Sequence, residues 1–191
     1  MPKKSNRREL LADTAMRLID DVGLAAVTHR AIDAAAGVPV GTTSNYFRTR
    51  AALYEAIAHR ILDHQLAAEA AASTSASSDR ADLVEALATA VDVGAGAARN
   101  RYLARFELSL EAARSPELAA VMRELRAVTL RTRAAQVRAV HPEATDEHID
   151  ALASLLTGVA FDRLTLGVPA MDTRDVVRAV VSGLLPGAAA S

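Results

Sequence analysis

The sequence predicts an all-α protein of about nine helices, and three observations support that fold class. Alanine and leucine dominate the 191 residues, with arginine and glutamate around them, and these residue types enter a helix at little cost in free energy. Apolar residues recur at intervals of three and four, and no stretch sustains the apolar–polar alternation of a strand. Glycine, proline and capping residues separate the periodic segments, and the sequence contains no internal repeat.

Four helices are predicted in the front third of the chain. One face of the first helix is apolar and consists of Leu11, Ala15, Leu18 and Val22. Gly23 ends that helix, Thr28 has the residue type of an N-cap for the second, and Gly37 ends the second. Pro39 stands near the start of a short third helix, and Thr49 can cap a long fourth. The predicted helices cover residues 7–21, 28–37, 39–47 and 50–72.

Five more helices follow a polar run, residues 73–79, which we interpret as a loop between helices. The run Ser115-Pro116-Glu117 is a strong start signal, with an N-cap serine, proline at the first position and an acid in the first turn. Glycine and proline end the last helices. The predicted helices cover residues 79–95, 100–113, 116–140, 146–166 and 172–185.

Two short helices around a glycine turn, preceded by a supporting helix, indicate a helix-turn-helix motif. The second short helix suits the major groove of DNA, which is about 12 Å wide. An apolar rear face would be supplied by Ile32, Ala35, Val38 and Phe47. Short donors and acceptors for base edges and phosphates would come from Thr42, Ser44, Asn45 and Tyr46. On the pattern alone, an exposed polar hairpin of an ordinary helical bundle remains an alternative.

Residues 10–53 also carry an ordered set of residues that is more specific than a generic helix-turn-helix. The set consists of Thr28, Ile32, Ala35-Ala36-Gly37-Val38, Gly41-Thr42, Phe47, Arg50 and Leu53. With this set the segment resembles the N-terminal DNA-binding domain of the TetR (tetracycline-repressor-like) family of transcriptional regulators. The resemblance implies a DNA-binding domain over residues 7–53, with its motif at about 27–46, and a helical ligand-binding and dimerisation domain over 54–187.

The same resemblance implies a homodimer that binds a palindromic operator in double-stranded DNA. Such a protein is usually a repressor that a small-molecule effector releases, although an activator or a repressor without an effector stays possible on these residues. Nothing in the sequence identifies the effector, and no cofactor is implied. A helical bundle whose head no longer binds DNA is a further alternative.

Four consecutive residues depart from the family pattern. Members commonly carry leucine, tyrosine, an aromatic residue and histidine where this chain has Thr43, Ser44, Asn45 and Tyr46. Thr43 therefore predicts looser packing behind the helix, and the phenol of Tyr46 can still donate to a phosphate. We expect Thr28, Tyr46 and Arg50 to contact phosphates. The residues expected to face bases are Val40, Gly41, Thr42, Ser44 and Asn45.

The body of the chain suggests a ligand pocket and a dimer interface. Bulky side chains in an alanine-rich segment could line the pocket or simply form core, and they are Tyr102, Phe106, Leu110, Met122 and Phe161. The last two helices are expected to form a four-helix dimer interface, with burial inside the monomer as the alternative. The interface residues are Ile149, Leu152, Leu156, Val159, Val177, Val180, Val181 and Leu184.

Charge and composition restrict the other function classes. Residues 1–60 hold nine Lys/Arg against six Asp/Glu, whereas residues 61–191 hold thirteen against seventeen, which favours a basic nucleic-acid-binding head. Non-specific attraction to phosphates would come from Lys3, Lys4, Arg7 and Arg8, unless they form only a solvated tail. There is no cysteine and no apolar run that could span a membrane, so we expect a cytoplasmic protein.

An enzyme is the remaining class. The chain has no Gly-rich phosphate loop, no Gly-x-Ser-x-Gly, no His-Glu-x-x-His and no nucleophilic cysteine, so we expect no catalytic site. His59 and Asp63 lie at i and i+4 with His64 adjacent, a spacing that could hold a metal. A solvated charge cluster is the more common origin of such a group, and we expect no metal site.

Overall fold

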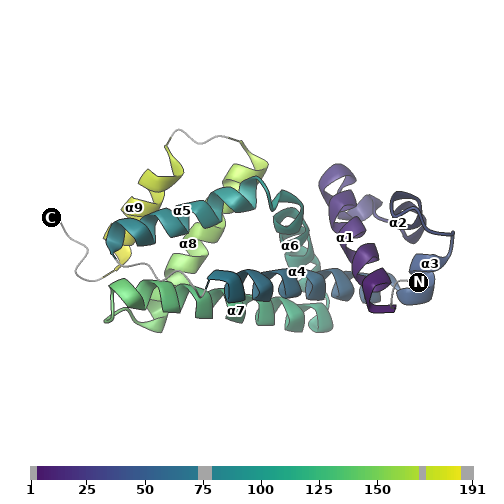
Figure 1. The fold of residues 1–191 in the computed structure, drawn as a ribbon, viewed down its shortest axis with the longest axis horizontal. Coiled ribbons are helices and arrows are strands. Elements are labelled where there is room, and N and C mark those ends of the chain that lie inside the picture. The colour runs from purple at the N-terminus through teal and green to yellow at the C-terminus, as the bar shows by residue number, and fades with distance from the viewer. Residues whose placement is uncertain (1–3, 73–78, 168–170, 186–191) are drawn as a thin grey trace. The chain divides into compact units, whose positions relative to one another are not determined.

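The computed structural model describes residues 4–72, 79–167 and 171–185. These residues form nine α-helices and a single turn of 3-10 helix, η1, and contain no strand (Figure 1). In chain order the elements are α1 (Lys4–Val22), η1 (Leu24–Ala26), α2 (His29–Ala35), α3 (Thr42–Tyr46), α4 (Arg50–Ala72), α5 (Arg80–Ala95), α6 (Arg99–Ala112), α7 (Pro116–Val140), α8 (Asp146–Thr165) and α9 (Thr173–Leu184). The predicted fold class is confirmed.

Capping residues start the helices where the sequence predicted starts. The side chain of Thr28 accepts a hydrogen bond from the backbone N–H of Ala31 at the start of α2. Asp79 accepts one from the N–H of Asp82 at the start of α5. Helices α4 and α7 have the predicted bounds. The rest of the predicted loop at residues 73–79, and the stop signals at 168–169 and 186–187, lie outside the described residues.

Two local features differ from prediction. The 3-10 turn η1 was not expected, because its residues carry no turn signal apart from the preceding Gly23. Helix α3 starts at Thr42, later than Pro39, because Gly41 adopts a left-handed conformation with φ of 91° that a helix cannot continue through. The base-facing helix is therefore only five residues long.

The chain forms two compact units. Unit 1 comprises the chain up to His64 together with Asn100–Leu125, and unit 2 comprises Gln65–Arg99 together with the chain from Arg126 onward. Helix α6 thus packs in the unit that contains α1, α2 and α3, a long-range association that sequence periodicity does not report. The predicted domain boundary between residues 53 and 54 stays a prediction.

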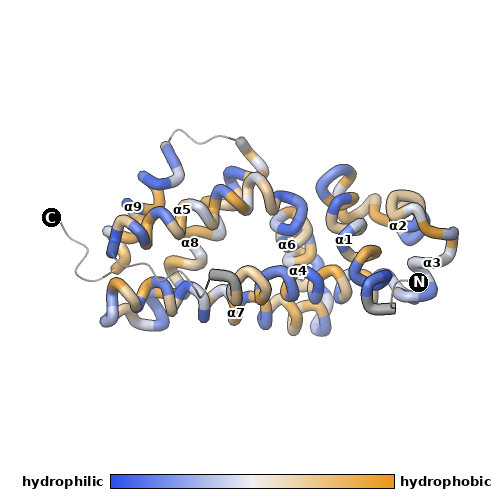
Figure 2. The backbone as a smooth tube through the Cα atoms, viewed as in Figure 1, coloured by the Kyte–Doolittle hydropathy of each residue, from blue (hydrophilic) through white to orange (hydrophobic). Residues whose placement is uncertain are grey.

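The core of unit 1 lies between α1, α2 and the helices packed on them. Figure 2 shows hydrophobic and hydrophilic residues alternating along the helices, as expected for helices with one buried face. Side chains at most 1% exposed include Leu11, Ile32, Phe47, Leu53, Ile57, Leu108 and Leu118. The predicted face of α1 is wrong at its end, because Val22 is 56% exposed and Met16 and Ile19 are buried instead. The helix ends at Val22, so that side chain lies beyond the packed turns.

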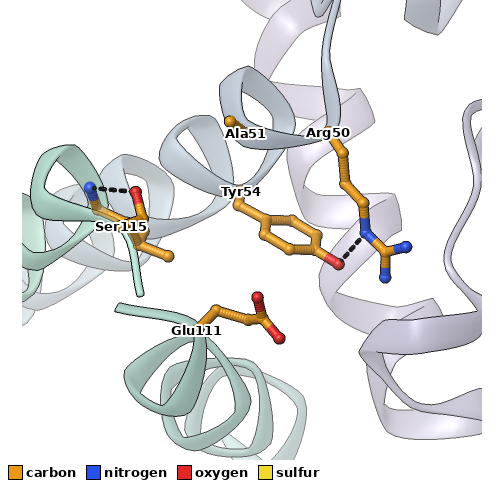
Figure 3. A pocket seen from close by; sticks show the side chains of 6 residues that line it. Arg50, Ala51, Tyr54, Glu111 and Ser115 are labelled. Carbon is orange, nitrogen blue, oxygen red and sulfur yellow. Dashed lines mark hydrogen bonds between the residues drawn. The ribbon is translucent and has the colours of Figure 1, made fainter. Parts of the chain in front are cut away.

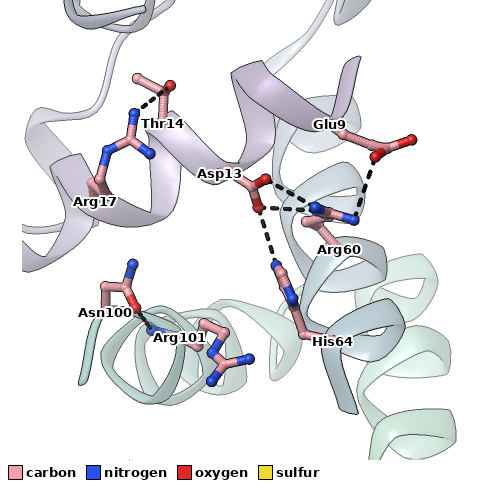
Figure 4. Close-up of polar contacts among 8 residues, drawn as sticks. All are labelled: Glu9, Asp13, Thr14, Arg17, Arg60, His64, Asn100 and Arg101. Carbon is pink, nitrogen blue, oxygen red and sulfur yellow. Dashed lines mark hydrogen bonds and ion pairs between the residues drawn. The ribbon is translucent and has the colours of Figure 1, made fainter. Parts of the chain in front are cut away.

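A polar cluster joins α1 to α4 inside unit 1. The Arg60 guanidinium donates two hydrogen bonds of 2.9 Å to the two carboxylate oxygens of Asp13, and His64 lies 3.2 Å from the same carboxylate (Figure 4). This bidentate geometry is the strong form of an arginine–carboxylate pair. His64 thus takes part in an inter-helix contact. Within the described residues, no group of three His, Cys, Asp or Glu side chains is arranged to hold a metal ion.

The core of unit 2 is formed by α5, α8 and α9, which contact one another. Its buried side chains include Leu83, Leu87, Ile149, Leu152, Leu156, Val177 and Val181. Five of these were predicted to lie in a dimer interface: Ile149, Leu152, Leu156, Val177 and Val181. The structure corrects that assignment, because each is at most 4% exposed in a single chain and is covered by the chain's own helices. Helical spacing identifies a buried face without specifying what buries it.

Polar contacts in unit 2 connect the same helices. Arg174 of α9 donates hydrogen bonds of 2.5 and 2.8 Å to the Glu85 carboxylate of α5. The Thr173 hydroxyl donates to the Asp92 carboxylate at 2.6 Å. The described helices include none that combines the length and hydrophobicity of a membrane span.

Candidate nucleic-acid interface

The turn between α2 and α3 depends on two glycines. Gly37 has φ of 64° and Gly41 has φ of 91°, and both values lie in the left-handed region that residues with a β-carbon rarely adopt. The N–H of Val38 donates to the Asp33 carbonyl and the N–H of Thr42 donates to the Pro39 carbonyl, which closes the turn. The predicted helix-turn-helix motif is therefore present, with a longer turn and a shorter second helix than expected.

A buried carboxylate of α2 holds the start of α3. Asp33 is 1% exposed and accepts three hydrogen bonds, at 2.7 Å from the N–H of Gly41, 2.7 Å from the N–H of Thr43 and 2.6 Å from the Thr43 hydroxyl. Sequence reasoning missed Asp33. The only signal is an acidic residue next to Ile32 within an otherwise apolar run, and its partners lie eight and ten residues away.

Thr43 packs more tightly than predicted. Its side chain is fully buried, and its hydroxyl donates to Asp33. The expectation of looser packing behind the recognition helix is wrong at this position. A threonine in place of a leucine removes apolar contact, but here the hydroxyl satisfies a buried carboxylate that an apolar side chain would leave with one bond fewer.

The outer face of α3 and the turn before it is exposed. Val40 is 82% exposed, Ser44 and Asn45 are exposed, and Gly41, Thr42 and Tyr46 are partly exposed. The hydroxyl of Thr42 donates to the Pro39 carbonyl and that of Ser44 to the Gly41 carbonyl, so both present lone pairs outward. Asn45 makes no side-chain hydrogen bond within the part of the chain described, which leaves its donor and its acceptor available.

Thr28 and Arg50, the two residues outside α3 that are expected to contact phosphates, make different contacts within the chain. Thr28 caps α2, and its hydroxyl proton remains available for a phosphate oxygen. Arg50 donates through Nε to the Tyr54 hydroxyl and lies over its ring, and a terminal nitrogen is 3.3 Å from the Leu24 carbonyl. Arg50 thus contacts η1 and α4 in this structure, in addition to any phosphate it can reach.

Two further contacts join separate elements of unit 1. The Glu107 carboxylate of α6 accepts a 2.7 Å hydrogen bond from the N–H of Leu24 in η1. The guanidinium of Arg8 lies 4.8 Å from the centre of the buried Phe47 ring, a cation–π distance, which places it near the end of α3. Of the other basic residues predicted to attract phosphates, Lys3 and the side chain of Lys4 lie outside the described residues.

Two carboxylates in unit 1, the buried Asp33 and the partly buried Asp13, have shifted pKa values. Burial opposes the charged form of Asp33 and would raise its pKa, but the hydrogen bonds from Thr43 and Gly41 outweigh burial and lower that pKa. Burial likewise opposes the charge of Asp13, and the hydrogen bonds from Arg60 and His64 outweigh it and lower the pKa of Asp13. Both carboxylates are therefore charged in the folded chain at neutral pH.

We expect the free energy of unfolding of unit 1 to fall as the pH drops below about 4. In that range the unfolded chain binds protons at Asp13 and Asp33 that the folded chain, with its lowered pKa values, does not bind. The stabilisation is fully present above the unfolded pKa and disappears as the pH falls through the folded one. Urea unfolding followed at several pH values measures this slope. Asp33→Asn should flatten it, and an unchanged slope would contradict the contribution of Asp33.

One cavity lies within unit 1, where the start of α4 faces the end of α6 and the start of α7. It has a volume of about 410 Å³ and is lined by Arg50, Ala51, Tyr54, Glu111, Ser115 and Leu118 (Figure 3). None of the five residues predicted to line a ligand pocket lines this cavity. Tyr102, Phe106 and Met122 are partly exposed, whereas Leu110 is 71% and Phe161 44% exposed.

Two family models match separate parts of the chain. Residues 11–57 match the model for bacterial regulatory proteins of the tetR family. Residues 78–187 match the model for a tetracyclin repressor-like C-terminal domain, which is more than half of the chain. No curated protein matches the chain.

Solved structures share the fold over nearly the whole chain. The multidrug binding protein EbrR complexed with imidazole is 26% identical, with a TM-score of 0.73, and the match covers 100% of this chain and 96% of that one. EbrR complexed with ethidium is 27% identical, with a TM-score of 0.72 and coverage of 94% and 99%. The transcriptional regulator SCO7518 from Streptomyces coelicolor A3(2) is 25% identical, with a TM-score of 0.66 and coverage of 91% and 97%.

Proposed function

The chain belongs to the TetR family of bacterial transcriptional regulators, and on that basis we propose that it is a homodimeric repressor that binds a palindromic operator and is released by a small-molecule effector. Membership makes it a DNA-binding regulator and not an enzyme, as the sequence predicted. Its site of action would then be the cytoplasm, where bacterial DNA lies. The observation that carries the DNA-binding part is the exposed polar face of α3, whose start is hydrogen-bonded to the buried Asp33.

The proposed DNA contacts fall into two groups. Thr28 and Tyr46, at the two ends of the motif, and Arg50, just after it, can contact phosphates, which positions the protein without reading sequence. The base-facing group is Val40, Gly41, Thr42, Ser44 and Asn45. Within this group Asn45 is best suited to recognise adenine, because its amide can pair with both the N6 and N7 positions in the major groove.

We expect Asn45→Ala to relax base preference at one position of each half-site. A bidentate asparagine–adenine contact contributes about 1–3 kcal/mol of discrimination, and its loss affects only the base it touches. Arg50→Ala should instead weaken binding to all sequences alike. Selection of binding sites from random DNA measures both effects, and identical base preferences for the two variants would contradict this division of roles.

A dimer interface is proposed on the exposed side of α8 and α9. The exposed apolar side chains of α8 are Leu155 and Phe161, with Gly158 between them, where an added β-carbon would meet nothing within 4 Å. Three residues of the predicted interface are partly exposed, and they are Val159 of α8 together with Val180 and Leu184 of α9. A small residue flanked by large apolar ones allows two helices to approach closely.

Sedimentation equilibrium at micromolar concentration tests the dimer directly. A dimer that reads a palindrome places its two recognition helices about 34–36 Å apart, so loss of dimerisation removes half of the contacts. Leu155→Arg should produce a monomer that has lost most of its affinity for the full operator. A wild-type monomer at these concentrations would reject the dimeric part of the proposal.

A cationic or heteroaromatic compound is the first effector class to test. The support is that EbrR, related at 26–27% identity, forms complexes with imidazole and ethidium. Of the bulky side chains predicted to line a pocket, Tyr102, Phe106 and Met122 lie in unit 1 and are partly exposed, and we propose that these three contribute to the effector site.

A gel shift against DNA upstream of the gene, followed by addition of ethidium, tests binding and release together. Release from the operator must be compared with release from unrelated DNA, because ethidium itself intercalates. Absence of any shift at low salt would favour the alternative of a helical bundle that no longer binds DNA.

A further inference from the structure

Helix α3 cannot hold its own conformation. It has five residues, and an isolated helix of that length is unstable because nucleation fixes several residues for one hydrogen bond. Its N-cap residue is Gly41, which has no side chain to accept the free N–H groups of the first turn. The start of the proposed base-reading helix therefore needs an acceptor from elsewhere in the chain.

Asp33 supplies that acceptor. One carboxylate oxygen accepts the N–H of Gly41, and the other accepts both the N–H and the hydroxyl of Thr43. These donors are the N-cap and the second residue of α3, where a capping side chain normally acts. The carboxylate belongs to α2, which is packed in unit 1 through the buried Ile32. The three bonds thus fix both the position of α3 and its rotation about its own axis.

We propose that Asp33 is the positioning residue of α3, the helix proposed to read the bases. From its place on α2 it caps the start of α3 and so orients Ser44 and Asn45 toward the bases. The inference rests on the proposed function for its effect on DNA, whereas the capping contact itself is independent of DNA. Asp33 touches no base or phosphate in this role, and it acts through the backbone of Gly41 and Thr43.

A purely electrostatic role for Asp33 predicts the opposite change in DNA affinity when this residue is replaced. Asp33 is a negative charge directly behind a surface proposed to bind a polyanion, so its removal should strengthen binding to any DNA if its only influence were electrostatic. A positioning role predicts that removal weakens binding to the operator and leaves non-specific binding nearly unchanged. The direction of the change therefore separates the two explanations.

Asp33→Asn is the principal variant, and Asp21→Asn is its matched control. The asparagine keeps one oxygen for Thr43 but presents an N–H₂ group to the N–H of Gly41, so one backbone donor loses its partner. Asp21 is an exposed acid at the end of α1, so its replacement removes the same charge without touching α3. We expect Asp33→Asn to lose roughly tenfold or more in operator affinity, with non-specific affinity within about twofold of wild type. Asp21→Asn should bind both DNAs as well as wild type or better.

A local measurement tests the cap without DNA. Hydrogen exchange at the amides of Gly41 and Thr43 should accelerate more in Asp33→Asn than exchange at amides in the core of α1 and α4. Equal acceleration everywhere would mean that Asp33 only stabilises the unit. If the wild-type chain binds no operator, the proposed function fails, and the exchange result still decides the cap.

Thr43→Val provides a milder test should Asp33→Asn fail to fold. It preserves the shape of the side chain and removes only the hydroxyl bond to Asp33, so we expect a few-fold loss of operator affinity and faster exchange at Thr43. The inference is overturned if the folded variants keep the wild-type ratio of operator to non-specific affinity. It is also overturned if Asp33→Asn binds the operator more tightly, as the electrostatic explanation requires.

Discussion

Phe47→Ala is expected to lower the free energy of unfolding of unit 1 by about 3–5 kcal/mol and to abolish operator binding. The ring is fully buried at the C-terminal end of α3, with Arg8 over one face and Tyr46 beside it at a ring-centre distance of 6.4 Å. Its removal leaves a cavity directly behind the recognition helix and deprives Arg8 of its packing partner. A loss of this size is a large fraction of the free energy of unfolding of a typical domain, which is about 5–15 kcal/mol.

Hydrogen exchange of the slowest amides of α1 and α2 measures this loss within unit 1. Leu110→Ala is the matched control, because it also truncates a large apolar side chain of unit 1, but one that is 71% exposed. We expect that control to stay within about 0.5 kcal/mol of wild type. If Phe47→Ala were equally harmless, the ring would not be the anchor of α3.

Leu152→Ala is expected to destabilise unit 2 by about 2–5 kcal/mol without weakening the dimer. Its side chain is fully buried within a single chain, so its truncation opens a cavity between α8 and its neighbours. Urea unfolding gives the loss in stability, and sedimentation equilibrium of the folded variant gives the dissociation constant. If the dissociation constant of the dimer rises while the stability of unit 2 is unchanged, Leu152 lies in the dimer interface.

Leu155→Ala is the matched control three residues along the same helix. That side chain is 49% exposed, so its truncation leaves little cavity and should change the stability of the protomer by less than about 1 kcal/mol. If the exposed side of α8 meets a second copy, the variant should dissociate at lower protein concentration than wild type. The two leucines therefore separate burial within the protomer from burial between protomers.

Much of the fold was predictable because its signals are local. Helix starts depend on side chains within three residues of the affected backbone, as at Thr28 and Asp79, and these predictions were confirmed. The turn was predictable for the same reason, since Gly37 adopts a left-handed conformation that few other residues tolerate. The family resemblance over residues 10–53, based on the order of such residues, was confirmed by the family models.

The errors concern packing partners. Periodicity predicted that Leu152 and Val181 face something apolar, and it could not distinguish a partner helix in the same chain from one in another. The end of α1 was misjudged at Val22, because a helical pattern does not show where the packed surface stops. The contact of Glu107 with Leu24 joins residues 83 apart, which no local spacing reports.

The sequence by itself determined the all-α class, the positions of the capped helices and the polar outer face of Ser44 and Asn45, because propensity, capping and periodicity act over a few residues. Only the tertiary structure decided how that face is held. In the sequence Asp33 is an ordinary acidic residue in the middle of a predicted helix. In the folded chain the N–H groups of Gly41 and Thr43 lie 2.7 Å from its carboxylate. A buried charge is stable only where donors from distant residues converge on it, and that convergence is a property of the folded chain.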